Sequence, residues 1–66
     1  MARLNNGEKA QVTNRIYSLL RQHDMGLRES EIAEMTRMDR RRVNNYLREL
    51  EAEDKAYKEG WEWFVD

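Results

Sequence analysis

The chain has 66 residues, enough for one small domain, and folding at that size buries only about 60% of the surface that the unfolded chain exposes. It contains no cysteine and a single histidine, which excludes a disulfide framework and a thiolate metal site. No apolar run approaches the roughly 20 residues of a membrane span, and the N-terminus lacks the apolar stretch of a secretory signal, so we expect a cytoplasmic protein with no membrane partner.

Charged residues make up 38% of the chain, and the two signs are segregated along it. The net charge is −1, but residues 37–48 contain five arginines and one aspartate, a charge of +4, so the rest of the chain carries −5. A nucleic-acid-binding domain is usually basic as a whole, yet a local basic segment supplies the electrostatic feature that binding needs. Mixed signs and periodic apolar residues predict a folded chain.

The first predicted element is a helix from about Gly7 to Gln22. Its apolar residues recur at the spacing i, i+4, i+7 and i+8, which places them on one stripe of a helix: Val12, Ile16, Leu19 and Leu20. Asn6 is a favourable N-cap, so residues 1–6 are expected to form a flexible tail, and Gly26 lies beyond the predicted end.

Two further helices are predicted, with a short turn between them. Residues 25–27 are long enough only for a strand stub, and residues 29–35 form the second helix, with glutamates at its N-terminal end. After a break of about three residues, Asp39 is the expected N-cap of a third helix over residues 40–51. The apolar positions of this helix again follow i, i+4 and i+7: Val43, Leu47 and Leu50.

Residues 55–65 predict a small β-hairpin, because β-favouring aromatic residues and valine flank a turn at Glu59–Gly60. Alternate residues of a strand share a face, so Trp61 and Trp63 are expected on one face and Phe64 on the other. The sequence leaves open which of the two faces packs inward.

Residues 31–51 contain an Ile-Ala-Glu-Met-Thr run, the Asp39 cap and an apolar stripe that ends in Tyr-Leu-Arg-Glu-Leu. This stretch resembles the helix-turn-helix of many bacterial and archaeal winged-helix transcriptional regulators, and the hairpin that follows resembles their wing. The likeness covers roughly residues 8–66. It implies an α+β, mainly α fold over residues 7–66, namely a three-helix helix-turn-helix core with a C-terminal hairpin wing of two or three strands.

The chain departs from the family pattern at two positions. Arg37 and Asp54 stand where the family usually has glycines, and both positions tend to require a positive φ. A fainter likeness is to winged helices that bind left-handed Z-form nucleic acid, because Asn44 and Trp63 fall where that group has an asparagine and a wing tryptophan. Arg48 replaces that group's helix tyrosine, however, and its wing prolines are absent.

The face of the third helix opposite its apolar stripe is rich in arginine and asparagine, because each residue turns the helix by about 100°. Together with flanking residues it gives the candidate DNA-binding set, which is Arg37, Arg40, Arg41, Arg42, Asn44, Asn45, Arg48 and Lys58. Arginine donates bidentately to guanine, asparagine pairs with adenine, and the major groove of DNA admits one helix. Glu49 is the one acid on this face.

The resemblance implies sequence-specific binding of double-stranded DNA by a small transcriptional regulator, with residues 40–51 in the major groove. Base contacts are expected from Arg40, Arg41, Asn44 and Asn45, and phosphate contacts from Arg37 and Arg48. Lys55 and Lys58 are the hairpin residues that could reach a phosphate or the minor groove, and the sequence leaves open whether the hairpin contacts DNA. The hypothesis requires these side chains to point outward and to be free of the protein's own carboxylates. So small a domain is expected to need a second copy or a neighbouring domain for tight binding.

The alternative hypothesis is a winged-helix module that binds another protein, which the nearly neutral net charge favours. Its expected signature is an exposed aromatic patch formed by Trp61, Trp63 or Phe64. Neither a Ser/His/Asp or Cys/His arrangement nor a glycine-rich phosphate loop nor metal-ligand spacing is present in the sequence. We therefore expect no enzymatic activity and no cofactor.

Overall fold

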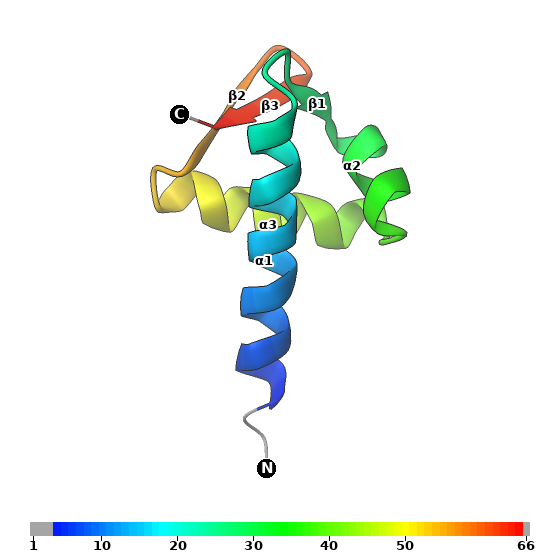
Figure 1. Cartoon of the computed structure of the whole chain (residues 1–66), viewed down its shortest axis with the longest axis vertical. Coiled ribbons are helices and arrows are strands. Elements are labelled where there is room, and N and C mark those ends of the chain that lie inside the picture. The colour runs from blue at the N-terminus through cyan, green and yellow to red at the C-terminus, as the bar shows by residue number, and fades with distance from the viewer. Residues whose placement is uncertain (1–3, 66) are drawn as a thin grey trace.

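The computed structural model describes the backbone of residues 4–65 and the side chains of residues 9–65 (Figure 1). This part of the chain is α+β, with three helices and one three-stranded antiparallel sheet. The elements in chain order are α1 (Leu4–Gln22), β1 (Leu27–Arg28), α2 (Glu29–Thr36), α3 (Arg40–Ala52), β2 (Ala56–Glu59) and β3 (Glu62–Val65). No helix of the described residues is both long enough and apolar enough to cross a membrane.

The helices and the sheet meet around the C-terminal half of α1. In Figure 1, α1 runs along the long axis, α3 crosses it, and the small sheet covers the end of α1 that lies farthest from the N-terminus. Helix α2 lies beside the end of α3 where α3 begins. The first turns of α1 extend beyond the other elements, so the core forms only where α1 reaches α3 and β3.

The core is built from one apolar stripe of each long helix and from the inner face of the sheet. The predicted stripe of α3 is confirmed, because Val43, Leu47 and Leu50 are fully buried. They pack with buried residues of the other elements, which are Ile16, Leu20, Leu27, Ile32, Ala33, Ala56 and Trp63. Burying one large apolar side chain stabilises a fold by about 1.5 to 3 kcal/mol, so this cluster fixes which face of α3 points outward.

Helix α1 begins three residues earlier than predicted. It starts at Leu4 instead of Gly7 and ends at Gln22, as predicted. Asn6 therefore lies inside the helix and is not its N-cap, and residues 4–6 belong to the helix, not to a tail. Residues 1–3 of the expected tail lie outside the described residues. A capping preference is a weak signal where, as here, no proline stops the helix from extending.

The positions of α2, α3 and the turn between them agree with the sequence prediction to within one residue. Asp39 is the N-cap residue of α3, although its side chain makes no capping hydrogen bond. Arg37 ends α2 in the left-handed region, with φ 59°. The backbone N–H of Met38 donates to the carbonyl of Ala33 at 3.0 Å, which is the closing hydrogen bond of a Schellman motif.

The end of α3 repeats this arrangement at Asp54, which has φ 61°. There the N–H of Lys55 donates to the carbonyl of Leu50 at 2.9 Å. The expectation of a positive φ at these two positions is therefore confirmed, with arginine and aspartate in a conformation that glycine adopts more readily.

Strand β3 is the centre of the sheet, between β1 and β2. The predicted strand stub is confirmed as β1, in which Leu27 pairs with Trp63. Close packing in this region requires Gly26, because a Cβ added there would lie 2.7 Å from ring carbons of Phe64. Gly26 also has φ +88°, a conformation that other residues rarely adopt.

The hairpin turn lies one residue later than predicted, at Gly60–Trp61, with φ 63° at Gly60. Trp61 therefore lies in the turn and not in the strand, so the strand alternation expected for Trp61 and Trp63 does not extend to Trp61. Trp63 is 1% exposed and belongs to the core, whereas Trp61 is 74% exposed. Phe64 is half-buried and stacks on Tyr57 with 5.5 Å between ring centroids.

Candidate nucleic-acid interface

The outward face of α3 divides into three sides according to what each side meets. Arg41, Asn45 and Arg48 lie opposite the buried stripe and are exposed. Toward α1, Arg42 is exposed and Glu49 pairs with Lys9, with 2.8 Å between Nζ and Oε2. The third side carries Arg40 and Asn44 and faces α2 and the hairpin. We name these the outer, α1 and α2 sides.

On the α1 side, Glu49 is the single acid that the sequence places on the outward face of α3, and its carboxylate is engaged by Lys9. The hydrogen bond and the charge of Glu49 raise the pKa of the Lys9 ammonium, with the hydrogen bond as the larger cause. Because Glu49 contacts α1, its carboxylate compensates Lys9 instead of an arginine of α3.

Three of the predicted arginines have no carboxylate partner among the described residues. They are Arg37, Arg41 and Arg42, which we call the open arginines, and all three are exposed. Arg37 lies in the turn just before α3, and the other two lie in its first turn. For these residues and for the exposed Asn45, the structure meets the requirement of outward, uncompensated side chains.

On the α2 side, the carboxylate of Glu29 accepts hydrogen bonds from two of the predicted residues. Arg40 Nη2 donates to Oε1 at 3.5 Å, and Asn44 Nδ2 donates to Oε2 at 2.5 Å. The Glu29 side chain is 21% exposed, whereas that of Arg40 is 67% exposed. The expectation that Arg40 and Asn44 are free of the protein's own carboxylates was therefore wrong.

The start of α2 explains why Glu29 faces α3. Arg28 is the N-cap residue of α2, with an extended backbone, and its N–H donates to Glu31 Oε1 at 2.8 Å. A side chain at the third helical position that returns to the N-cap N–H is one half of a capping box, and it fixes where the helix begins. Glu29 is thereby held in the first turn, where the helix dipole favours a carboxylate.

Glu29 lies in a polar pocket of about 300 Å³ between α2, α3 and the hairpin. We call it the Glu29 pocket, and it is lined by Arg28, Glu29, Ser30, Arg40, Asn44, Lys58, Trp61 and Trp63. Its charged lining residues are three cations and one carboxylate. The pocket thus combines anion-binding side chains with an internal acid that already uses two of the available donors.

The hairpin contributes Lys58 and two tryptophans to this pocket. Lys58 Nζ lies 5.8 Å from the ring centroid of Trp61 and 6.0 Å from that of Trp63, in cation–π range of both. The indole N–H of Trp63 is buried and has no hydrogen-bond partner among the described residues. Lys55, in contrast, pairs with Glu53 at 3.4 Å, so Lys58 is the hairpin lysine that the structure brings to α3.

Two further ion pairs near the site are longer than the contacts of Glu29, and their glutamate side chains are more exposed. Arg48 Nη1 lies 3.8 Å from Glu51 Oε1 one turn along α3, and both side chains are well exposed. Arg28 Nε lies 4.0 Å from Glu62 Oε2 across the β1–β3 pair. The requirement of a free side chain is thus also unmet for Arg48, although exposed pairs of this kind are worth only about 0 to 1 kcal/mol.

The structure brings Arg40, Asn44 and Lys58 together and leaves the other predicted residues outside that group. Sequence reasoning missed the other lining residues of the pocket, Arg28, Glu29, Ser30 and Trp61 among them. The sequence does place a glutamate in the first turn of α2. The contact that matters joins residues 29 and 44, however, and no local pattern reports a pair so far apart along the chain.

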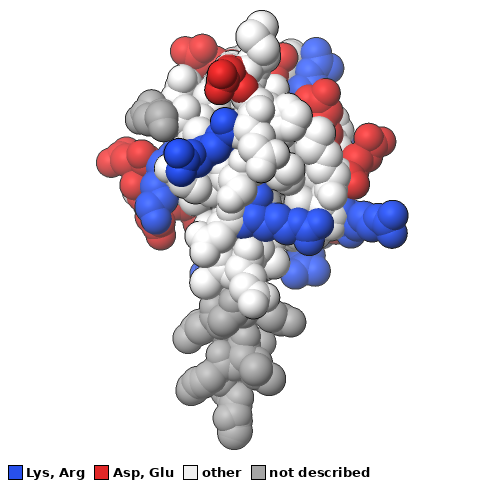
Figure 2. Space-filling view, viewed as in Figure 1, with Lys and Arg blue, Asp and Glu red and all other residues white. Residues whose placement is uncertain are grey.

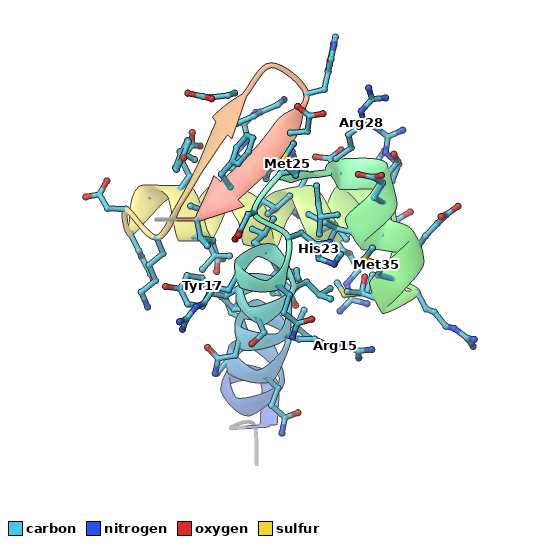
Figure 3. The ribbon with its side chains drawn as sticks, turned by 45° about the horizontal axis from the view of Figure 1, so that its top comes forward. Arg15, Tyr17, His23, Met25, Arg28 and Met35 are labelled. Carbon is cyan, nitrogen blue, oxygen red and sulfur yellow. The ribbon has the colours of Figure 1, made fainter. Side chains whose placement is uncertain are left out.

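Charge is distributed differently on the face that carries α1. Figure 2 shows basic and acidic side chains interspersed there, with no continuous area of one sign. In Figure 3, Arg28 lies at the start of α2 beside the sheet, whereas Arg15 projects from α1. The candidate interface is the exposed surface of α3 together with the elements that adjoin its first half.

Comparisons with protein-family models, curated proteins and solved structures give no match to this chain. Among the described residues, no group of three or more His, Cys, Asp or Glu side chains is placed to hold a metal ion. Inference about function therefore depends on the geometry of α3 and its surroundings.

Proposed function

We propose that this chain is a winged-helix domain that binds double-stranded DNA in a sequence-specific way, with α3 in the major groove. In this proposal the β2–β3 hairpin is the wing and the chain is a small transcriptional regulator or the DNA-binding part of one. It acts by binding, with no catalytic step and no cofactor.

One observation carries the proposal. Helix α3 buries its apolar stripe completely, yet presents the open arginines of its first turn and Asn45 outward without a described carboxylate partner. An arginine fork matches the guanine edge, an asparagine amide matches the adenine edge, and additional guanidinium groups bind phosphates. The side of α3 that the core leaves exposed is thus the side with the chemistry of base and phosphate recognition.

The elements around α3 support the same proposal. Only residues 37–39 separate α2 from α3, as in a helix-turn-helix, and base edges are met by the first half of the second helix of that motif. We assign base contacts to Arg41 and Asn45, and phosphate contacts to Arg37, Arg42 and Arg48. The assignment of Arg40 and Asn44 to base contacts depends on the carboxylate of Glu29.

The alternative protein-binding module receives less support from the aromatic residues. Of the three expected in an exposed patch, Trp63 is buried, Phe64 is half-buried against Tyr57, and only Trp61 is exposed. The exposed large apolar side chains of the described residues are Met25, Met35, Tyr57 and Trp61, so the patch expected from Trp61, Trp63 and Phe64 is present only at Trp61.

The test is an amide chemical-shift titration of the whole chain with a mixed-sequence DNA duplex at low and high salt. We expect the largest shifts at residues 37–45, and binding that weakens steeply as salt is added, because released counterions drive phosphate binding. Absence of binding at low salt, or shifts confined to the far end of α1, would contradict the proposal.

A further inference from the structure

The two hydrogen bonds to Glu29 occupy donors that a nucleic-acid phosphate would use. Arg40 and Asn44 donate to different oxygens of the same carboxylate, so both oxygens of Glu29 are engaged. The contact with Glu29 engages one of the five N–H donors of the Arg40 guanidinium, so a phosphate that binds Arg40 does so next to an acceptor that is already present. It must also approach the negative charge of the carboxylate itself.

The position of Glu29 makes it unlike the other acids close to α3. Glu49 and Glu51 pair with exposed cations at the edges of the helix, whereas Glu29 lies inside a pocket and is itself mostly buried. Its neighbours in the pocket are Arg28 and Lys58 as well as Arg40, so the lining would carry one more net positive charge without it. Charges that are shielded from solvent interact more strongly than exposed charges at the same distance.

We propose that Glu29 is an internal competitor of nucleic-acid phosphate, which holds Arg40 and Asn44 in the free protein and weakens sequence-independent binding at the α2 side of α3. This inference rests on the proposed function and assigns Glu29 the role of a specificity-determining residue. Phosphate contacts strengthen binding to every sequence, so a carboxylate that reduces them lowers the affinity for non-target DNA. The open arginines are unaffected, because Glu29 pairs with Arg40 and Asn44 and with none of Arg37, Arg41 and Arg42.

The experiment compares E29Q with E34Q in fluorescence-anisotropy titrations of a mixed-sequence duplex over a range of salt concentrations. Both variants remove one negative charge from α2, but Glu34 is exposed and pairs with no described cation. We expect E29Q to bind about three- to tenfold more tightly at low salt, with a slope of log affinity against log salt that is steeper by about one phosphate contact. E34Q is expected to change the affinity less than twofold.

Adding R40A to the wild-type chain and to E29Q tests whether Arg40 is the donor that Glu29 restrains. In the wild-type background R40A is expected to weaken binding less than threefold, and in the E29Q background it should abolish most of the gain. Such a double-mutant cycle reports coupling between the two residues separately from their individual effects. Thermal unfolding of each variant establishes that all four proteins are folded.

The possible outcomes separate this inference from the function on which it rests. Equal affinities of E29Q and E34Q, while the wild-type chain binds DNA with a steep salt dependence, would overturn the role of Glu29 and leave the proposed function standing. A gain in E29Q that persists when R40A is added would overturn it as well. If neither the wild-type chain nor E29Q binds a duplex at low salt, both proposals fail. Duplex binding by E29Q but not by the wild-type chain would directly support the role of Glu29 as a competitor of phosphate.

Discussion

The outer and α2 sides of α3 both carry arginine and asparagine, but they differ in whether a carboxylate of the protein pairs with these side chains. On the α2 side, one carboxylate accepts hydrogen bonds from both Arg40 and Asn44. On the outer side, Arg41 and Asn45 are exposed and make no such contact with a described residue. The number of arginines in a helix is thus a poor measure of the positive charge available to a ligand. A neighbouring helix decides which of them are free.

The two sides also differ in their surroundings. The residues of the outer side are exposed, whereas the α2 side forms one wall of a pocket whose other wall is the hairpin. Substitutions that act on one side and spare the other therefore test whether the difference is real.

The largest effect is expected in the wall of the Glu29 pocket, where Trp63 and Trp61 are both lining residues. Trp63→Ala removes a fully buried indole from the core and should lower the free energy of unfolding by about 3 to 5 kcal/mol, a large part of what a domain of this size has. Trp61→Ala removes an exposed side chain and should change it by less than about 0.5 kcal/mol.

Urea unfolding of the two tryptophan variants, followed by circular dichroism, measures both values. A loss on Trp61→Ala as large as that on Trp63→Ala would show that the hairpin packs by a different face. The pocket as described here would then not exist.

A smaller effect is expected on DNA binding when the two sides of α3 are compared directly. Arg41→Ala should weaken duplex binding by about 1 to 3 kcal/mol, because it removes an uncompensated guanidinium from the outer side. Arg40→Ala should cost well under 1 kcal/mol in the wild-type chain, since Glu29 already accepts from that side chain. Arg15→Ala, on α1, is the matched control for the loss of one exposed arginine.

Anisotropy titrations at a fixed low salt concentration rank these three arginine variants. Equal losses for Arg40→Ala and Arg41→Ala would remove the distinction between the two sides. A loss for Arg15→Ala as large as that for Arg41→Ala would indicate that binding follows the total charge and not α3.

The smallest effects are expected at the two left-handed residues, one near the outer side of α3 and one at its far end. Arg37→Gly and Asp54→Gly should each raise the free energy of unfolding by about 0.5 to 1 kcal/mol, because glycine adopts a positive φ without steric strain. The gain should be larger at Arg37, since aspartate tolerates this conformation better than arginine does.

Only one of these two glycine substitutions should weaken DNA binding. Arg37→Gly is expected to reduce the salt slope by about one phosphate contact, whereas Asp54→Gly removes no cation. Denaturant unfolding and salt titrations of the same two proteins test both parts. Weaker binding by Asp54→Gly would place the interface at the other end of α3.

Local patterns in the sequence predicted the order of elements and most of their bounds. The stripe of Val43, Leu47 and Leu50 follows from helical periodicity, and Asp39 follows from N-cap preference. The errors occurred where a local signal was weak or displaced. The start of α1 lacks a strong stop signal, and the turn formed at Gly60–Trp61, which placed Trp61 in the turn instead of the strand.

The candidate site could be predicted only in part. The periodicity of α3 is sufficient to place Arg41, Arg42 and Asn45 outward, because a helix whose apolar stripe is buried has only one orientation available. The same reasoning placed Arg40 and Asn44 outward and uncompensated, and there it failed. Helical periodicity describes one helix, and it contains no information about the acid that a second helix brings within hydrogen-bond distance.

By itself, the sequence determined the order of the helices and strands, the buried stripe of α3, and the concentration of positive charge between residues 37 and 48. These properties depend on neighbours along the chain, within one helical turn or one strand. The tertiary structure alone decided that Glu29 reaches Arg40 and Asn44, that Glu49 pairs with Lys9, and that Lys58 joins α3 in one pocket. Ion pairs and pockets between elements depend on how those elements pack, and packing brings together residues that are far apart in the sequence.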